Sequence, residues 1–198
     1  MKKKMLRLYR HALKDVTGEH ASEEGLEAAI VLGSDQPVIN VIALAKAGRT
    51  SEGLVALMTT LANKQSEAIR LLGLINGLSD PMCLPWLAAK GLKAEAQKCK
   101  NNPEDPKEEG NFVQATINLT TPEEFELVAK SCFLPVALIL SKLEWGETGL
   151  ALGHTPFAEL AAYAVDAKMA KDLKPLACLE GIEFREYENG EYEFSLLQ

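Results

Sequence analysis

The chain has 198 residues and a formal net charge of −7, a length that suits one large domain or two small ones. Its hydrophobic fraction of 47% and charged fraction of 25% are typical of a globular protein and exclude a disordered acidic chain. The negative balance argues against non-specific nucleic-acid binding, which needs clustered lysines and arginines, and no apolar run is long enough to predict a membrane span.

The N-terminal hundred residues predict short helices separated by tight turns. Apolar residues recur at helical spacing over residues 3–16, which predicts an amphipathic helix. Its basic residues form either a phosphate-binding patch or a solvated helix face; they are Lys2, Lys3, Lys4, Arg7 and Arg10. Ser22, followed by two glutamates, predicts the start of a second helix that runs to Leu32.

Prolines and capping residues place the next helices. Pro37 fits the first position of a helix, and Pro85 should bend or restart the helix that contains it. The predicted helices are residues 37–48, about 50–63, 66–76 and a segment that begins at Asp80-Pro81.

Two stretches of this half align at an offset of 44 positions, so that Pro37 falls on Pro81 and Lys46 on Lys90. The segment "AIRLLGLINGLSDPMCLPWLAAKG" resembles HEAT and armadillo-type helical repeats, especially the short HEAT form of the phycobilisome-lyase type. The resemblance implies stacked helix pairs and a protein-binding surface rather than catalysis. An ordinary helical bundle without repeats is the alternative.

Composition changes at residues 101–111, "NNPEDPKEEGN", which predict a polar linker or long exposed loop. Residues 112–119 favour a strand, and "TPEE" at 121–124 is a capping box that begins a helix. Thr155-Pro156 predicts another helix start, with a helix to about Lys171. Residues 133–143 are too apolar to assign between helix and strand.

The C-terminal "GIEFREYENGEYEFSLL" predicts a β-hairpin that turns at Asn189-Gly190. A two-residue loop would place like charges opposite each other, so we expect a three-residue loop with a bulge at Gly190. The expected pairs are Ile182–Leu196, Phe184–Phe194, Arg185–Glu193 and Glu186–Tyr192. Phe184, Phe194, Tyr192 and Leu196 are expected to face the core.

These elements predict an α+β fold that is mostly α. A helical, HEAT-like region at 1–100 precedes the linker at 101–111, and a smaller α+β region at 112–198 ends in the hairpin.

The sequence offers little evidence of chemistry. His11, His20 and His154 lack metal-ligand spacing, and no motif for a cofactor or a phosphate loop occurs, so we assign no catalytic residue, metal or cofactor. In "LGHTP", His154 is either a general base with a cysteine nucleophile or a loop residue beside the Thr155 cap. Among the four cysteines, Cys83 and Cys132 are expected to be buried and reduced, and Cys99 to be exposed and labelled first.

We therefore expect a non-enzymatic cytoplasmic protein that binds another protein, of basic character given the negative charge. An adaptor, a secretion-type chaperone and an immunity or inhibitor protein all fit. The candidate partner-binding residues are Trp86, Trp145 and Asn40, since tryptophan is enriched in interface hot spots. The alternatives are a hydrolase-type enzyme that uses His154 and a nucleic-acid-binding helical protein.

Overall fold

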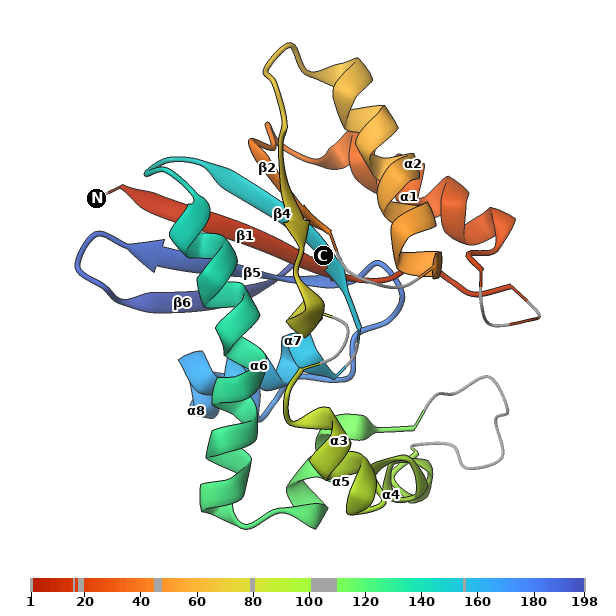
Figure 1. The fold of residues 1–198 in the computed structure, drawn as a ribbon, viewed down its shortest axis with the longest axis vertical. Coiled ribbons are helices and arrows are strands. Elements are labelled where there is room, and N and C mark those ends of the chain that lie inside the picture. The colour runs from red at the N-terminus through yellow and green to blue at the C-terminus, as the bar shows by residue number, and fades with distance from the viewer. Residues whose placement is uncertain are drawn as a thin grey trace.

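A computed structural model describes residues 2–15, 17, 20–44, 48–78, 81–100, 110–154 and 156–197. Its centre is a six-stranded sheet with the strand order β3-β2-β4-β1-β5-β6 (Figure 1). The strands are β1 Lys3–Arg10, β2 Val41–Leu44, β3 Arg70–Leu74, β4 Thr148–Gly153, β5 Gly181–Tyr187 and β6 Tyr192–Leu197. The first four are parallel, whereas β5 runs antiparallel to both β1 and β6.

Helices cover both faces of the sheet. On one face α2 (Gly48–Lys64) lies over the strands, with α1 (Glu23–Asp35) packed against it. The other face carries α6 (Pro122–Lys142) and α7 (Phe157–Val165), which pack on each other and on the sheet. The shorter elements are the 3-10 helix η1 (Asn76–Leu78), α3 (Leu84–Ala89), α4 (Leu92–Lys98), α5 (Phe112–Leu119) and α8 (Ala167–Ala170).

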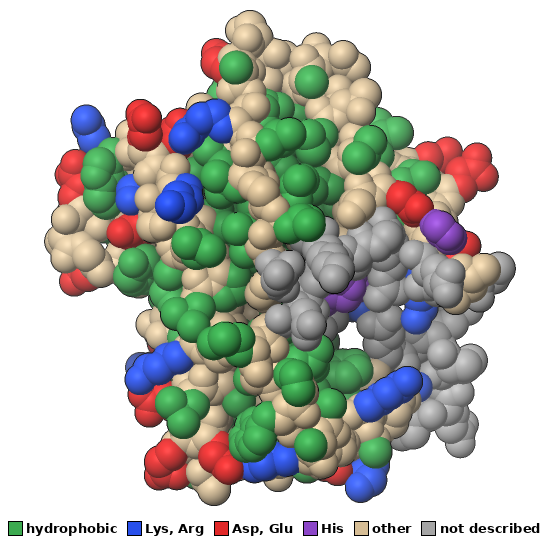
Figure 2. All heavy atoms as spheres, viewed as in Figure 1, with side chains coloured by type: hydrophobic (Ala, Val, Ile, Leu, Met, Phe, Trp, Pro, Cys, Tyr) green, Lys and Arg blue, Asp and Glu red, His purple; other side chains and the backbone are tan. Residues whose placement is uncertain are grey.

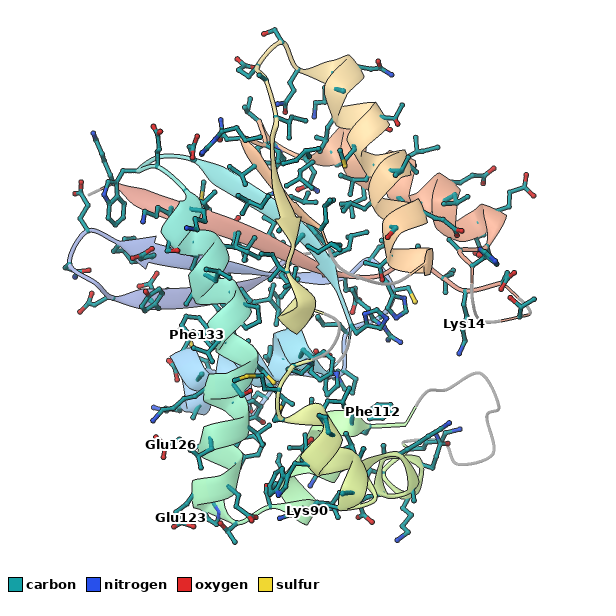
Figure 3. All side chains as sticks on the ribbon, viewed as in Figure 1. Lys14, Lys90, Phe112, Glu123, Glu126 and Phe133 are labelled. Carbon is teal, nitrogen blue, oxygen red and sulfur yellow. The ribbon has the colours of Figure 1, made fainter. Side chains whose placement is uncertain are left out.

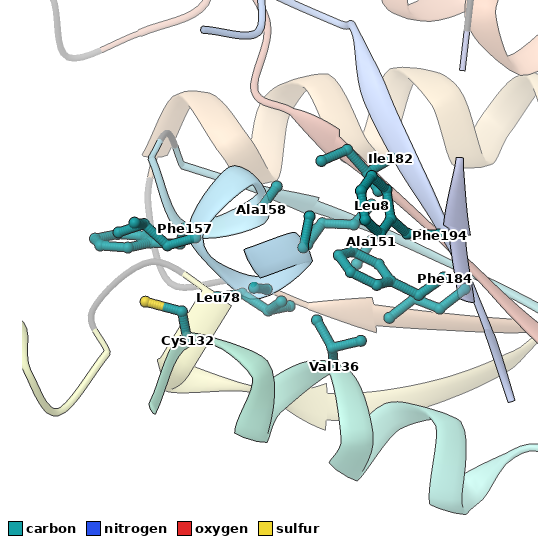
Figure 4. Close-up of a cluster of buried hydrophobic side chains, with 14 of the residues drawn as sticks. Leu8, Leu78, Cys132, Val136, Ala151, Phe157, Ala158, Ile182, Phe184 and Phe194 are labelled. Atoms are coloured by element: carbon teal, nitrogen blue, oxygen red, sulfur yellow. The ribbon is translucent and has the colours of Figure 1, made fainter. Parts of the chain in front are cut away.

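Alternation along the strands builds the two cores. Leu8 of β1 belongs to the core under α6 and α7 (Figure 4), and its neighbour Tyr9 belongs to the core under α2. In β4, Ala151 belongs to the core under α6 and α7, and its neighbour Leu150 belongs to the core under α2. Because successive side chains point to opposite faces, both faces are apolar and the chain forms three layers.

The predicted fold class and the HEAT resemblance are wrong. The structure is an α/β fold on a mixed sheet, and the two aligned stretches adopt different structures. In residues 26–46 a helix precedes strand β2, whereas in residues 70–90 strand β3 precedes helix α3. Segments that differ in secondary structure cannot stack as repeats.

Several other elements also differ from expectation. Residues 3–16 and 37–48 contain strands β1 and β2 rather than helices, residues 66–76 contain β3, and residues 112–119 form helix α5 rather than a strand. Strand β4 was not predicted at all. The linker residues 101–109, with Ser79, Asp80 and Thr155, lie outside the described residues.

Helices with capping signals are confirmed. Ser22 Oγ accepts a hydrogen bond from Gly25 N at the start of α1, and α2 lies where a helix was expected. Thr121 and Glu124 form the capping box of α6, which also contains most of the undecided residues 133–143.

The hairpin register is confirmed. Ile182 pairs with Leu196, Phe184 with Phe194, and Glu186 with Tyr192, around a loop in which Gly190 has a φ of 81°. Phe184 and Phe194 are buried, whereas Tyr192 and Leu196 stay exposed. β6 is the edge strand of the sheet, so fewer neighbouring side chains pack over Tyr192 and Leu196.

Both halves of the chain contribute to this sheet, because β4 lies between β1 and β2. The division into regions 1–100 and 112–198 stays a prediction. In the part of the chain that the structure describes, no helix is both long and apolar enough to span a membrane.

Candidate active site

Two histidines meet at the carboxyl ends of adjacent parallel strands. β1 ends at Arg10 and is followed by His11, and β4 ends at Gly153 and is followed by His154. Arg10 pairs with Gly153 in the ladder, so the histidines lie level. Their ring centroids are 4.7 Å apart, with the ring planes inclined at 55°. The carboxyl edge of parallel strands is where α/β sheets commonly form ligand sites.

Backbone hydrogen bonds fix both histidines. His11 N donates to Gly153 O at 2.9 Å, and His154 N donates to Leu78 O of η1 at 3.2 Å. A Cβ atom at Gly153 would lie 3.1 Å from Leu78 O. The glycine therefore allows η1 to approach β4 closely enough to hold His154.

The hydrogen bond of the His11 ring defines which nitrogen is available for chemistry. Nδ1 lies 2.8 Å from the carbonyl oxygen of Ala12, which can only accept, so Nδ1 carries the proton and donates. The lone pair is then on Nε2. His11 is 3% exposed and lines the adjoining cavity.

That cavity has a volume of about 760 Å³ and reaches from His11 to α5. Three of its lining residues are cationic: Arg10, Lys14 and Lys174. Others are apolar, among them Phe112 of α5 and Leu173. Figure 3 labels Lys14 and Phe112, which belong to different parts of the lining. The cavity therefore combines positive charge with apolar surface.

Arg10 and Glu159 anchor one wall of the cavity. Arg10 Nη1 donates to Leu176 O at 2.6 Å, and Leu176 N donates to Glu159 Oε1 at 3.0 Å. The carbonyl oxygen of Leu176 is thus held by the Arg10 guanidinium group, and its backbone N–H by the Glu159 carboxyl group. The hydrogen bond to Leu176 O fixes the guanidinium group of Arg10, which lines the same cavity as His11.

Glu159 of α7 is 1% exposed. Burial raises the pKa of its carboxyl group to about 7, although the Leu176 hydrogen bond and the charge of Arg10 act in the opposite direction. The group therefore exchanges its proton near neutral pH while lining the cavity.

The arrangement suits attack on an anionic group. Imidazole forms covalent intermediates in nucleophilic catalysis, and a guanidinium group binds phosphate or carboxylate oxygens. Across the described residues, no cluster of histidine, cysteine, aspartate or glutamate could hold a metal ion.

The residues predicted to bind a partner lie elsewhere. Trp145 and Asn40 precede β4 and β2, at the end of the strands opposite the histidines. Trp145 is 41% exposed with Lys4 Nζ 4.5 Å from its ring centroid, and Asn40 Oδ1 accepts a hydrogen bond from Thr148 N.

Trp86 belongs to α3, a helix that lies away from strands β2 and β4 (Figure 1). Trp86 is 39% exposed, with Lys90 Nζ 4.1 Å from its ring centroid. Asn40 is not in a helix, so the stacked helices expected to bring Trp86 and Asn40 together do not exist. A partner-binding role for these residues stays a prediction.

Sequence reasoning assigned both Arg10 and His11 to an amphipathic helix. Arg10 was named only as part of a possible phosphate-binding patch, and His11 was missed as a site residue. His154 was considered as a general base with a cysteine, whereas the aromatic ring beside it is His11. One signal was available: both histidines directly follow short apolar stretches, "MLRLYR" and "GLALG", which are compatible with buried strands.

Solved structures similar to this chain include a phosphoglycerate mutase and two phosphatases. Phosphoglycerate mutase from Bacillus anthracis str. Sterne is similar with a TM-score of 0.63 and 15% identity, covering 99% of this chain and 93% of that chain. Phosphoserine phosphatase from Entamoeba histolytica, solved with 3-phosphoglyceric acid, has a TM-score of 0.56, 12% identity and coverages of 98% and 97%. A mycobacterial glucosyl-3-phosphoglycerate phosphatase has a TM-score of 0.51, 15% identity and coverages of 98% and 96%.

The chain has an α/β fold like that of phosphoglycerate mutase. No protein-family model matches the sequence, and no curated protein matches it by sequence. The fold is therefore recognised from structure, at identities too low to carry an activity across.

The comparisons overturn the expected function. A non-enzymatic adaptor, chaperone or immunity protein is the wrong prediction, because the structural neighbours are a mutase and phosphatases. The alternative of a hydrolase-type enzyme agrees better with these structural neighbours.

Proposed function

We propose that the protein is a phosphatase in which His11 is the nucleophile and Arg10 and His154 bind the phosphoryl group. The observation that carries the proposal is the contact between the two imidazole rings, 4.7 Å apart, at a cavity lined by Arg10 and His11. The similarity of the fold to phosphatases supports it.

In the first step the cations of the cavity bind the phosphoryl oxygens, which spread negative charge in the transition state. Nε2 of His11 attacks phosphorus and a P–N bond forms. The bond from phosphorus to the leaving oxygen breaks, and that oxygen keeps the electron pair and takes a proton from water. His154 donates a hydrogen bond to the transferring group.

In the second step water attacks the phosphorus of the phosphohistidine and releases a proton to the solvent, which neutralises the hydroxide left by the first step. A P–O bond forms and the P–N bond breaks, so that inorganic phosphate leaves and His11 is restored. The hydrogen bond from Nδ1 to Ala12 O holds the ring in one orientation through both steps, which keeps Nε2 directed at the phosphorus.

The proposed substrate is a small phosphorylated molecule. A cavity of about 760 Å³ is in the usual range for small-molecule sites, and its apolar lining offers contacts to the non-phosphorylated part. The alternative proposal is that the substrate is a phosphorylated form of the basic protein partner expected from the sequence. The cytoplasmic location, drawn from four widely spaced cysteines, also remains a proposal.

Hydrolysis of p-nitrophenyl phosphate tests the mechanism. His11→Asn preserves a side-chain N–H for Ala12 O but removes the nucleophile, and we expect kcat/KM to fall by about 10³-fold or more. His20→Asn is the matched control, because His20 is exposed and contacts Glu52 rather than the cavity; its activity should be that of the wild type. Equal activity of His11→Asn and the wild type would contradict the proposal.

Chemical trapping gives a second measurement. Wild-type protein quenched in alkali during turnover should carry a phosphoryl group on His11 that is lost in acid, as expected of a P–N bond. Small phosphomonoesters and a phosphorylated protein, compared as substrates, distinguish the two proposed carriers through their kcat/KM values.

A further inference from the structure

We propose that Cys83 and Cys132 form an oxidation site that closes to a disulfide on reaction with a peroxide. Their sulfur atoms are 4.0 Å apart, and they belong to segments far apart in the chain. Cys83 directly precedes α3, and Cys132 lies within α6. A disulfide has an S–S distance of about 2.0 Å, so the sulfurs have to approach each other by about 2 Å.

The two thiols have different surroundings. Cys132 is 2% exposed and lies in the core with Leu78 and Val136 (Figure 4). Cys83 is half-buried. An oxidant therefore meets Cys83 first, and Cys132 is sheltered directly behind it.

Hydrogen bonding makes Cys83 the reactive member. The Cys132 thiol lowers the pKa of Cys83 to about 7 by donating to its thiolate, with a smaller contribution from Ser131 and an opposing effect of burial. The same hydrogen bond and burial raise the pKa of Cys132. An ionised, accessible thiol beside a second thiol is the arrangement in which a sulfenic acid is captured as a disulfide.

The chemistry balances with hydrogen peroxide as the oxidant. The Cys83 thiolate attacks one oxygen, an S–O bond forms, the O–O bond breaks, and the departing hydroxide takes a proton to become water. The Cys132 sulfur then attacks the sulfenic sulfur of Cys83. The S–S bond forms, the S–O bond breaks, and the oxygen leaves as water with the proton of Cys132. Two thiols lose two electrons and peroxide gains them.

The order in which the cysteines are expected to react therefore differs from the order predicted from the sequence. Cys132 is buried as expected, but Cys83 is only half-buried. Burial and the nearby Glu95 carboxylate raise the pKa of Cys99, which was expected to react first. Cys83 therefore replaces it as the thiol most ready to react at neutral pH.

The disulfide would fasten a segment that supports the histidine site. Between β3 and Cys83, Gly77 packs against Pro135 of α6, and Leu78 O accepts the hydrogen bond from His154 N. A disulfide from Cys83 to Cys132 of α6 would attach the segment between β3 and α3 to α6 at a second place, in addition to the contact of Gly77 with Pro135.

Peptide mapping after oxidation tests the proposal. Wild-type protein is treated with hydrogen peroxide at pH 7, alkylated under denaturing conditions, digested without reductant and analysed by mass spectrometry. We expect intact protein that has lost two hydrogen atoms, a cross-linked peptide pair containing Cys83 and Cys132, and full reversal by dithiothreitol. Cys99→Ser and Cys178→Ser are the matched controls and should form the same cross-link.

Variants of the pair complete the test. Cys83→Ser should abolish the cross-link, and Cys132→Ala should let a sulfenic acid accumulate on Cys83, where dimedone captures it. Wild-type mapping decides the proposal even if the buried substitution prevents folding. A disulfide that involves Cys99 or Cys178, direct conversion of Cys83 to sulfinic acid, or four unreacted thiols would each overturn it. The test uses no phosphorylated substrate, so its outcome is independent of the proposed phosphatase activity.

Discussion

At the scale of single residues, Glu159 couples stability to pH. Its folded pKa of about 7 compares with an ordinary value of 4.5. Between these values the folded protein retains a proton that the unfolded chain has lost. The contribution to stability is therefore fully present below pH 4.5 and is lost as the pH rises towards 7. The difference corresponds to roughly 3 kcal/mol.

We expect Glu159→Gln to remove this dependence. Measured by urea unfolding from pH 4.5 to 8, the free energy of unfolding of the wild type should fall relative to Glu159→Gln by roughly 3 kcal/mol. Glu27→Gln, on the exposed side of α1, is the matched control and should keep the wild-type slope. Parallel curves for the wild type and Glu159→Gln would show that the carboxyl group titrates normally.

Residues whose partners are near in sequence could be predicted, and the site residues could not. Thr121 and Glu124 are three positions apart and form their capping box through one helical turn. His11 and His154 come from opposite ends of the chain and meet only because β1 pairs with β4. A single sequence carries no record of that pairing, so each histidine was judged without the other.

At the scale of elements, central parallel strands were the hardest to predict. β2 and β4 are covered on both faces, so they appear in the sequence as short apolar runs without polar alternation. In β1, "KKMLRLYR", lysines and arginines interrupt the apolar residues, and the spacing was compatible with a helix. The hairpin has a turn signal and cross-strand pairs to fix its register, and it was predicted correctly. α5 contains β-branched residues that favour a strand, but Asn111 accepts a hydrogen bond from Gln114 N and begins a helix, so a local capping interaction outweighs the strand propensity.

The packing of η1 on α6 gives a prediction at this scale. A Cβ atom added at Gly77 would lie 2.8 Å from Cγ of Pro135, and a proline ring has little freedom to move aside. We expect Gly77→Ala to lower the free energy of unfolding by about 1–3 kcal/mol, as measured by urea denaturation.

Gly73→Ala is the matched control for this substitution. A Cβ atom at Gly73 would meet nothing within 4 Å, so its effect should stay within about 0.5 kcal/mol. If the two variants are equally stable, η1 does not depend on close contact with Pro135.

At the scale of the whole molecule, net charge did not predict the charge of the cavity lining. The chain carries −7, which suggested a basic partner, yet the cavity is lined by Arg10, Lys14 and Lys174. Acidic and basic side chains lie mostly around the margin of the face in Figure 2, and hydrophobic side chains gather in its middle. Local charge beside the reacting group governs ligand choice, whereas net charge acts at longer range.

The order of strands gives the last prediction. In the sheet β1 pairs with β4 and β5, and β2 pairs with β3 and β4. A fragment of residues 1–100 therefore retains β1 without either neighbour and leaves one edge of β2 unpaired. The fragment 112–198 retains β4 without β1 and β2, and lacks the α2 layer that covers one face of β4.

We expect neither fragment to fold alone, because unpaired backbone groups and uncovered apolar faces are costly. Thermal melting followed by circular dichroism should show no cooperative transition for either fragment, and an equimolar mixture should regain part of the transition of the intact chain. A cooperative transition in residues 1–100 alone would show that the two regions are separate folding units joined at 101–111. The six-stranded sheet would then form when the two folded regions dock on each other.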